Sequence, residues 1–451
     1  MRDNSGRIIL LLAMVILVFT AGGLWLFLNR GADPTPGLVD RLIGGEVTLL
    51  DSSPDPAFGS GGAARIQGPA ILAPAALLVD DAAIHVVVTA AQVPGDEHFA
   101  VARLDASGRL DAGFGRQGLA EVDFGGGDQV ARGGLLQPDG KLIVFGHASA
   151  GGTKRNMAVA RLLANGSLDP SFDGDGLAAV RFGDGIQSAE AAGLDAAGRL
   201  TLAGYAEQAI AGEVFREMAF ARLLPDGSLD SSFGQGGLLR DRTRLDMTDQ
   251  SLAALLVAPN GELRAAGSSL SAGAADRRPL LGQWLPAGAR DSSFGQRGLA
   301  ELETGTGQLL ALADAGEGRT LAAGTAGADG RGVFLLRLLP GGAPDPDFGD
   351  DGVLRMGGAQ DAAVSGMQLW ALGNQVLLVQ DDGQALSATT LTPSGMRLPG
   401  MTRRLVLGPR GGAAVAALVG GRVWTAHAAG GDPSPIVVQR FDLAGGAAGG
   451  Q

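Results

Sequence analysis

A nine-residue stretch recurs along this chain and limits its fold more than any other feature. It reads LDSSFGQGG at residues 229–237, and five variants of it lie elsewhere in the sequence. The phenylalanines of the six copies are Phe58, Phe114, Phe172, Phe233, Phe294 and Phe348. They lie 56, 58, 61, 61 and 54 residues apart. A nearly fixed period of this length indicates an array of similar supersecondary units.

Each unit is predicted to contain four short antiparallel strands. In the unit that begins at Phe172 they lie within LAAVRFG (177–183), IQSAEAAGLDAAG (186–198), RLTLAGYA (199–206) and EMAFARLL (217–224). Gly-containing dipeptides such as Ala197-Gly198 separate the second strand from the third and provide the backbone conformations of a tight hairpin. Four short strands joined by tight turns are typical of one blade of a β-propeller.

Seven units are expected, because a degenerate seventh follows the six clear copies, with Met401 at the phenylalanine position. Seven units of about 55 residues fill a closed ring. The predicted fold class is therefore all-β, a seven-bladed β-propeller with four-stranded antiparallel blades, preceded by one N-terminal transmembrane helix. The repeats are predicted at about 55–108, 111–166, 169–227, 230–288, 291–342, 345–395 and 398–446.

The closure of the ring is predicted from a segment that precedes the first repeat. A strand at 46–50 (EVTLL) is expected to pair with the last unit and latch the ring. The alternative architecture is an open solenoid, which requires polar capping units at both ends. No such unit is visible in the sequence, so the closed ring is the expected arrangement.

The N-terminal segment predicts a membrane anchor. Residues 8–28 (IILLLAMVILVFTAGGLWLFL) carry no charge and are long enough to cross a bilayer as a helix. We expect a short cytoplasmic N-terminus at 1–7, the anchor at 8–28, a tether at 29–44, the propeller at 45–446 and a tail at 447–451. Arg2 and Arg7 favour a bacterial inner-membrane protein with its propeller in the periplasm or outside the cell. The alternative is a cleaved signal peptide and a secreted protein.

Three of these stretches together resemble a known family. LDSSFGQGG, the LLQPDGKLIVFGH stretch (135–147) and the MAFARLLPDGSLD stretch (218–230) are similar to the delta-60 repeat family of bacterial proteins. The resemblance covers residues 55 to 395 well and the last unit weakly. It implies a β-propeller, and it implies no catalytic residue, because these repeats usually have no assigned activity.

Arginine and aspartate recur at a fixed spacing of eight residues around the strand that precedes each motif. We predict repeated Arg–carboxylate pairs that stabilise the fold, since the planar guanidinium of arginine suits a carboxylate partner. Each aspartate is also a candidate to cap its own turn through backbone N–H groups. The predicted pairs are Arg103 with Asp111, Arg161 with Asp169, Arg222 with Asp230, Arg337 with Asp345 and, across the ring seam, Arg440 with Asp55.

The phenylalanine of each motif is predicted to be part of the core. One large apolar side chain per unit, next to glycine, fits the gap between neighbouring blades. The alternative is a ring of aromatic side chains that grips a ligand, but ligand sites are seldom so uniform.

A third set of repeated positions is polar and varied, and it is the predicted ligand site. The third strand of each unit ends in Thr89, His147, Tyr205, Ser268, Thr325 or His427, just before the most variable loops. We take Thr89, His147, Tyr205 and His427 as the ligand-binding residues, because variable loops carry binding function. The alternative is that these are polar strand ends that face water. Gln129, Gln187, Gln250 and Gln308, on the same face, are predicted to hydrogen-bond their own loops.

Composition excludes several function classes. The net charge of −12 disfavours nucleic-acid partners, and the absence of cysteine excludes thiolate chemistry. The four histidines are scattered, so we predict no metal site. We also predict no cofactor and no catalytic residues. We predict a membrane-anchored extracytoplasmic binding or scaffold module with a protein or small-molecule partner. The alternative is a hydrolase or lyase with its site in the central channel, where ionisable groups with shifted pKa values would converge.

Overall fold

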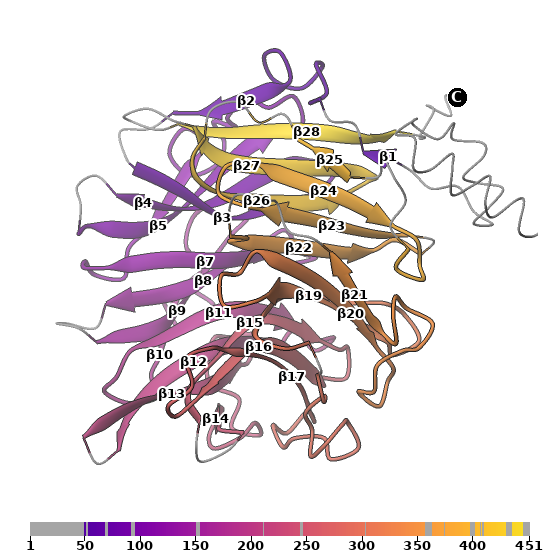
Figure 1. The fold of residues 1–451 in the computed structure, drawn as a ribbon. Coiled ribbons are helices and arrows are strands. Elements are labelled where there is room, and N and C mark those ends of the chain that lie inside the picture. Colours follow the sequence, from indigo (N-terminus) through magenta and orange to yellow (C-terminus); the bar gives the residue numbers. More distant parts are fainter. Residues whose placement is uncertain are drawn as a thin grey trace, which may run out of the picture.

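The protein is described by a computed structural model that covers most of the repeat region. The described residues are 49–50, 53–67, 71–91, 95–149, 154–210, 212–243, 247–302, 304–356, 363–373, 375–396, 402–405, 407, 410–429 and 435–444. Within these residues all regular secondary structure is β-strand, and the strands are numbered β1 to β28. They form consecutive groups along the chain (Figure 1), and we call each group of neighbouring antiparallel strands a blade.

Six blades follow one another in chain order, and each runs from an inner strand to an outer one. Blade 1 contains β3 (Ile71–Val79), β4 (Ala83–Ala91), β5 (Glu97–Asp105) and β6 (Leu119–Val122). Blade 2 contains β7 (Gln129–Leu136), β8 (Leu142–Ser149), β9 (Arg155–Leu162) and β10 (Leu177–Val180). Blade 3 contains β11 (Gln187–Leu194), β12 (Leu200–Ile210), β13 (Glu213–Leu223) and β14 (Leu238–Asp241). Blade 4 contains β15 (Met247–Val257), β16 (Leu263–Ser271) and β17 (Arg278–Trp284). Blade 5 contains β18 (Gly307–Asp314), β19 (Thr320–Ala326), β20 (Gly332–Leu338) and β21 (Val353–Met356). Blade 6 contains β22 (Gly366–Ala371), β23 (Val376–Asp381), β24 (Leu386–Leu391) and β25 (Thr402–Arg404).

The last blade combines strands from both ends of the repeat region. It contains β26 (Arg410–Val419), β27 (Arg422–Ala429), β28 (Ile436–Ala444) and, as its outer strand, β2 (Ala63–Ile66). The short strand β1 (Leu49–Leu50) pairs with the far end of β28. The inner strands β3, β7, β11, β15, β18, β22 and β26 each contact the next, and β26 contacts β3. The blades therefore close into a ring, which is the arrangement of a β-propeller.

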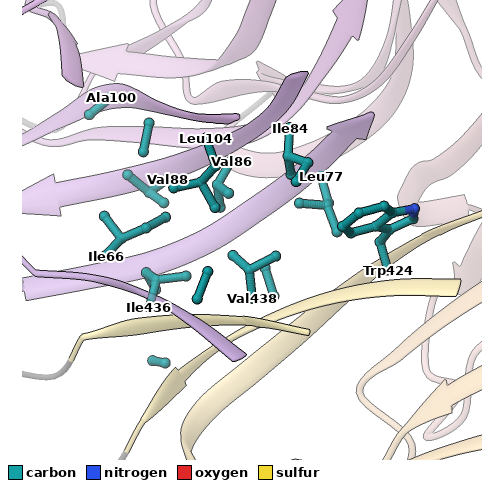
Figure 2. Close-up of a cluster of buried hydrophobic side chains, with 14 of the residues drawn as sticks. Ile66, Leu77, Ile84, Val86, Val88, Ala100, Leu104, Trp424, Ile436 and Val438 are labelled. Carbon is teal, nitrogen blue, oxygen red and sulfur yellow. The ribbon is translucent and has the colours of Figure 1, made fainter. Parts of the chain in front are cut away.

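The ring closes on an apolar core that joins the first and last blades. Figure 2 shows Ile66 of β2, Val86 and Val88 of β4, Trp424 of β27 and Val438 of β28 gathered in one cluster. All five side chains are buried, and they come from opposite ends of the repeat region. Burial of apolar surface, at about 25 cal/mol per Å², therefore holds the seam together.

The sheets do not coincide with the sequence repeats. The strand that directly follows each motif pairs with the last strand of the preceding repeat, as β10 does with β9. In the first repeat this strand is β2, whose partner is β28 at the other end of the chain. The offset links every repeat to its neighbour, and at the seam it links the two ends of the chain.

The structure corrects the predicted fold class in two respects. Hydrogen bonds join the described strands into six sheets instead of seven separate four-stranded ones, because a single parallel bridge from Arg216 to Asp249 links blades 3 and 4 into one seven-stranded sheet. No helix within the described ranges is long and apolar enough to span a bilayer. Residues 8–28, predicted as a transmembrane helix, lie outside the described residues. The structure does not support the predicted anchor helix or the single-pass inner-membrane location.

The motif packs each blade against the next. Phe172 is buried, and the turn at Gly227 of the following blade lies directly over its ring. A Cβ at Gly227 would lie 3.1 Å from Phe172 Cδ2 and 2.6 Å from Asp173 N, and its φ of +88° also favours glycine. Asp173 N donates to Asp226 O in the same turn, at 2.7 Å. The spacing between motifs is thus the length of chain from one blade-to-blade contact to the next.

The inner strands carry a repeated β-bulge that a glycine accommodates. In blade 2 the register shifts between Ala131 and Gly133, which leaves Arg132 as the extra residue. The carbonyl of Val130 then leans over Gly146 of β8, where a Cβ would lie only 2.0 Å from that oxygen. Blade 3 repeats the arrangement with Glu190 as its extra residue. Bulges of this kind redirect a side chain away from the regular pleat.

Candidate functional site

The structure places each predicted arginine next to its predicted aspartate. The Nε atoms donate to Oδ2 atoms at 2.7 to 3.0 Å in the pairs Arg103–Asp111, Arg161–Asp169, Arg222–Asp230, Arg337–Asp345 and Arg440–Asp55. Each guanidinium also lies 4.6 to 5.5 Å from the ring centroid of the adjacent motif phenylalanine. Four of the arginines reach a backbone carbonyl of the next blade, as Arg337 does at Pro393 O (2.5 Å). These contacts hold neighbouring blades together.

The other carboxylate oxygen of each aspartate caps the motif turn. Asp169 Oδ1 accepts from Ser171 N at 3.0 Å, and Asp230 Oδ1 accepts from Ser232 N at 3.0 Å. Burial alone would raise the pKa of Asp169, but the hydrogen bonds from Ser171 and the charge of Arg161 lower it to about 2. Each aspartate therefore has both predicted roles. One carboxylate oxygen accepts from the arginine, and the other accepts from the backbone of the motif turn.

Blade 4 lacks the arginine of this pair and replaces it from another strand. Gln283 Nε2 donates to Asp291 Oδ2 at 2.7 Å, and Arg264 of β16 donates to Gln283 Oε1 at 2.7 Å. Arg264 also donates to Thr320 Oγ1 of blade 5 at 2.6 Å. A guanidinium from the neighbouring strand thus supplies the missing blade-to-blade contact.

The four predicted ligand-binding residues do not form a common open site. His147 and His427 are buried, and Thr89 and Tyr205 are partly buried. His147 Nδ1 lies 3.1 Å from Ser188 Oγ on the inner strand of the next blade, and Thr89 Oγ1 accepts from Ala131 N in the same way. At Thr89 and His147 the polar residue at the end of the third strand therefore makes a contact between blades. Among the four residues, only Tyr205 belongs to the cluster described below.

Buried histidines give the fold a dependence on pH. Burial lowers the pKa of His85 to about 4, and burial together with Arg132 and Arg155 does the same for His147. His85 Nδ1 has no hydrogen-bond partner among the described residues, and its ring meets the edge of Phe114 at 5.7 Å. Both side chains are therefore neutral in the folded protein at neutral pH.

We predict that His85→Leu makes folding less sensitive to acid. An unfolded histidine has a pKa near 6.5, so the stability that comes from neutral His85 is complete above about pH 6.5 and is lost as the pH falls through about 4. By about pH 4.5 the parent should lose about 2 to 3 kcal/mol that the variant keeps. Urea unfolding of both proteins at about pH 7 and pH 4.5 measures the difference. An equal loss in both proteins would show that His85 does not titrate in this way.

The repeated glutamines bond their own loops in three blades. Gln129 Oε1 accepts from Phe124 N at 2.9 Å, Gln187 Oε1 from Phe182 N at 3.1 Å and Gln250 Oε1 from Thr243 N at 3.0 Å. Gln308 instead lines a cleft between blades 4 and 5. The fourth member of the set is thus placed beside the site described next.

A cluster of charged and aromatic side chains lies at one end of blades 3 and 4. The guanidinium of Arg216 lies 4.1 Å from the ring centroid of Tyr205, and its Nη2 donates to Glu207 Oε1 at 3.1 Å. Its Nη1 lies 3.8 Å from Asp249 Oδ2, and Asp249 also accepts from Arg277. Arg277 Nη1 reaches Ser268 Oγ at 3.1 Å. These ion pairs connect β12, β13, β15 and the loop before β17.

Polar atoms in this cluster remain without partners. Arg216 Nε and Asp249 Oδ1 are buried, and neither has a hydrogen-bond partner among the described residues. The extra residues of the inner-strand bulges extend the cluster toward blade 2, where Arg132 Nε lies 3.5 Å from Glu190 Oε2. Unsatisfied buried polar atoms cost free energy, and a ligand that pairs with them recovers it.

A cleft opens beside the cluster, between blades 4 and 5. It has a volume of about 290 Å³, and its walls include Asp276, Arg277, Gln308 and Thr325. Gln308 and Thr325 belong to the repeated polar positions found in the sequence, whereas Asp276 and Arg277 come from the variable loop before β17. The cleft therefore offers a guanidinium, a carboxylate, an amide and a hydroxyl within one small volume, close to the lower limit for a small-ligand site.

A long hairpin stands next to this surface. Strands β12 and β13 each have 11 residues and pair up to Ile210 and Glu213, beyond the ends of the corresponding strands in blade 2 (Figure 1). Ile210 and Val214 at its tip are exposed, with Val214 at 64%. We call the Tyr205–Arg216–Asp249–Arg277 cluster, the cleft and this hairpin tip the loop-face site.

Arg216, Asp249 and Arg277 of the loop-face site were not predicted as site residues, because they lie at the edges of loops that the sequence marks as variable. A repeated signal was available. Arg155, Arg216 and Arg277 lie 61 residues apart, and Asp128 and Asp249 each directly precede a repeated glutamine. Within the described ranges, no group of three or more His, Cys, Asp or Glu side chains could hold a metal ion.

Comparisons with known proteins address the fold. Residues 137–172 and 198–233 match the family model described as "Domain of unknown function (DUF5122) beta-propeller". No curated protein matches the chain.

Among solved structures, a protein of unknown function from Dyadobacter fermentans is 12% identical, with a TM-score of 0.42, over 84% of this chain and 97% of that one. The β-propeller domain of the Trilobed protease from Pyrococcus furiosus is 10% identical, with a TM-score of 0.43, over 82% and 95%. The WD40 domain of Toxoplasma gondii coronin is 10% identical, with a TM-score of 0.42, over 83% and 82%. The two stretches that match the family model support a β-propeller repeat family, and the resemblance to delta-60 repeats stays a prediction.

Proposed function

We propose that this protein is a binding module that engages another protein through the loop-face site. The observation that carries the proposal is the position of the β12–β13 hairpin. Its exposed Ile210 and Val214 project next to the stacked Tyr205 and Arg216. Aromatic and arginine side chains with neighbouring apolar groups are enriched in the energetically important part of protein interfaces.

The charges of the loop-face site favour binding over catalysis. Arg216, Asp249, Glu207 and Arg277 form ion pairs with one another. A hydrolytic site needs an acid or base whose pKa is displaced toward the working pH. Paired side chains of opposite sign are better suited to recognising the polar groups of a partner, because they present fixed donors and acceptors.

The proposal is tested with a photoreactive residue placed in the cleft. We expect p-benzoylphenylalanine at Ala328, which lines the cleft, to crosslink one host protein. Arg277→Ala should reduce that product by about tenfold, since interface arginines often contribute more than 1 kcal/mol. The matched control places the same residue at Ser60, in a motif turn at the opposite end of the strands. Equal products at Ala328 and Ser60, or no effect of Arg277→Ala, would refute the loop-face site.

A further inference from the structure

A second groove lies on the outer rim of the ring, between blades 4 and 5. It has a volume of about 590 Å³. The apolar side chains that line it are Leu302, Leu336, Pro344 and Val353. Leu336 belongs to the core between the two blades, and Val353 packs against that core. We call it the rim groove. It is formed by different residues from the loop-face site and lies along the outer strands instead of at the strand ends.

Proline explains why the rim is open at this interface. Gln283 N donates to Gly298 O, and Ala300 N donates to Leu281 O, so alternate residues of β17 face the outer segment. The next residue to face it is Pro279, which has no N–H to donate. In blade 2 the equivalent pairing continues to Met157 and Val180. Among the described residues of blade 4 the outer strand is reduced to a bridge at Leu299, and the chain beyond it becomes one wall of the groove.

Three substitutions within the repeat also separate this interface from the previous one. Between blades 3 and 4, Asp241 accepts from Trp284 Nε1 at 2.7 Å and from Arg290 Nε at 2.7 Å, and these side chains fill the rim. The corresponding positions between blades 4 and 5 are occupied by Leu302, Leu338 and Pro344. The large polar side chains are absent there, so an apolar space remains.

The charged side chains around the rim groove are three carboxylates and Arg355, and Arg355 is not free because it already has an interaction of its own. Glu301, Asp350 and Asp351 line it with exposed carboxylates, and none of the three has an ion-pair or hydrogen-bond partner for its side chain within the part of the chain that is described. Thr304 also lines the groove. Its side chain is 7% exposed, and its buried Oγ1 has no hydrogen-bond partner among the described residues. An apolar floor, three unpaired carboxylates and one unsatisfied hydroxyl define the chemistry of the occupant.

We propose that the rim groove binds a short extended segment of another protein that carries an aliphatic side chain beside a lysine or arginine. The aliphatic group would pack on Leu302, Leu336 and Val353, and its transfer from water would supply the affinity. The cation would face Asp350 and Asp351, and the backbone of the segment would satisfy Thr304. A volume of this size accepts a few residues, in agreement with a short linear segment.

The probe is a random hexapeptide pool, from which the full chain selects binders. We expect enriched sequences to combine an aliphatic residue with an adjacent lysine or arginine. The double variant E301Q/D351N should weaken binding of the selected peptides by about tenfold, because each rim charge contributes up to about 1 kcal/mol. Asparagine suits position 351, where φ is +47°. V353W, which fills the groove, should abolish selection, and the melting temperature of each variant checks that it folds.

The outcomes separate this site from the loop-face site. Arg277→Ala should leave peptide selection unchanged, because Arg277 does not line the rim groove. A negative result in the crosslinking experiment at the loop-face site therefore does not contradict peptide binding in the rim groove. Selection of peptides without a cation, or equal selection by E301Q/D351N, would overturn the proposal. Binding of free leucinamide as tight as that of the selected peptides would also overturn it, since the groove would then be a small-molecule site.

Discussion

Replacing Arg222 with alanine is expected to destabilise the protein by about 3 to 5 kcal/mol. Arg222 is 2% exposed, and its Nε donates to Asp230 Oδ2 at 2.7 Å. The substitution leaves the buried carboxylate of Asp230 with only the more distant Arg199, whose Nη1 lies 3.7 Å away, and removes a hydrogen bond to Pro286 O in the next blade. Removal of one partner of a buried ion pair is costly because the remaining charge stays desolvated. Urea unfolding at neutral pH measures the loss.

Arg103 is the matched control for this prediction. It makes the equivalent contacts with an aspartate and a motif phenylalanine in blade 1, but its partner Asp111 has a side chain that is 36% exposed. Water can solvate Asp111 after the substitution, so Arg103→Ala should cost only about 1 kcal/mol. The double variant R222A/D230A should be more stable than the sum of its single variants implies. Equal losses for Arg103→Ala and Arg222→Ala would contradict the assigned role of burial.

Phe233→Ala is expected to produce a loss of similar size, about 3 to 5 kcal/mol. The ring of Phe233 is fully buried in a cluster with Phe220 and Trp284, and the turn of the next blade at Gly288 lies against it. Truncation removes apolar contacts on both sides of the blade interface and leaves a cavity that the β-sheets cannot collapse to fill. Urea unfolding measures this loss as well.

Two further substitutions control this prediction. Phe233→Leu keeps most of the volume and should cost about 1 to 2 kcal/mol. Leu229→Ala, four residues earlier in the same motif, should cost less than about 1 kcal/mol because that side chain is 40% exposed. If Phe233→Ala were no worse than Leu229→Ala, the phenylalanine would not be the wedge between blades.

The two large effects depend on the same contact. The guanidinium of Arg222 lies 4.6 Å from the ring centroid of Phe233, so each side chain helps to position the other. The motif therefore combines a buried ring, a cation above it, an aspartate that binds the cation and a glycine turn from the next blade. Repetition of this unit explains why the sequence varies so little at these positions.

Several features could be predicted from the sequence because they depend on residues close together in the chain. The eight-residue spacing of Arg222 and Asp230 spans one strand end and one turn, and local geometry brings such residues together. The short strands and their glycine turns follow from alternation and backbone preference. Gln308 and Thr325 were also marked by their repeated positions, and they do meet, in the cleft between blades 4 and 5.

Other features depend on which blades become neighbours, and no local pattern contains that information. Buried His147 contacts Ser188 on the inner strand of the next blade. The loop-face site joins Tyr205, Asp249 and Arg277 from two neighbouring blades, and only the packing of those blades brings these side chains together. The structure does not support the membrane anchor predicted from the hydropathy of residues 8–28.

The sequence alone therefore determined the repeated unit: its length, its four strands, and the Arg–Asp–Phe–Gly contacts that recur in it. The tertiary structure decided how units share strands. The segment Ala63–Ile66 has the same pattern as every other strand after a motif, yet it completes the last blade, because closing the ring places it beside β28. It also decided that Pro279 opens a groove on the rim. The first outcome depends on contacts between distant parts of the chain, which only a closed ring creates. The second depends on the packing of two consecutive blades.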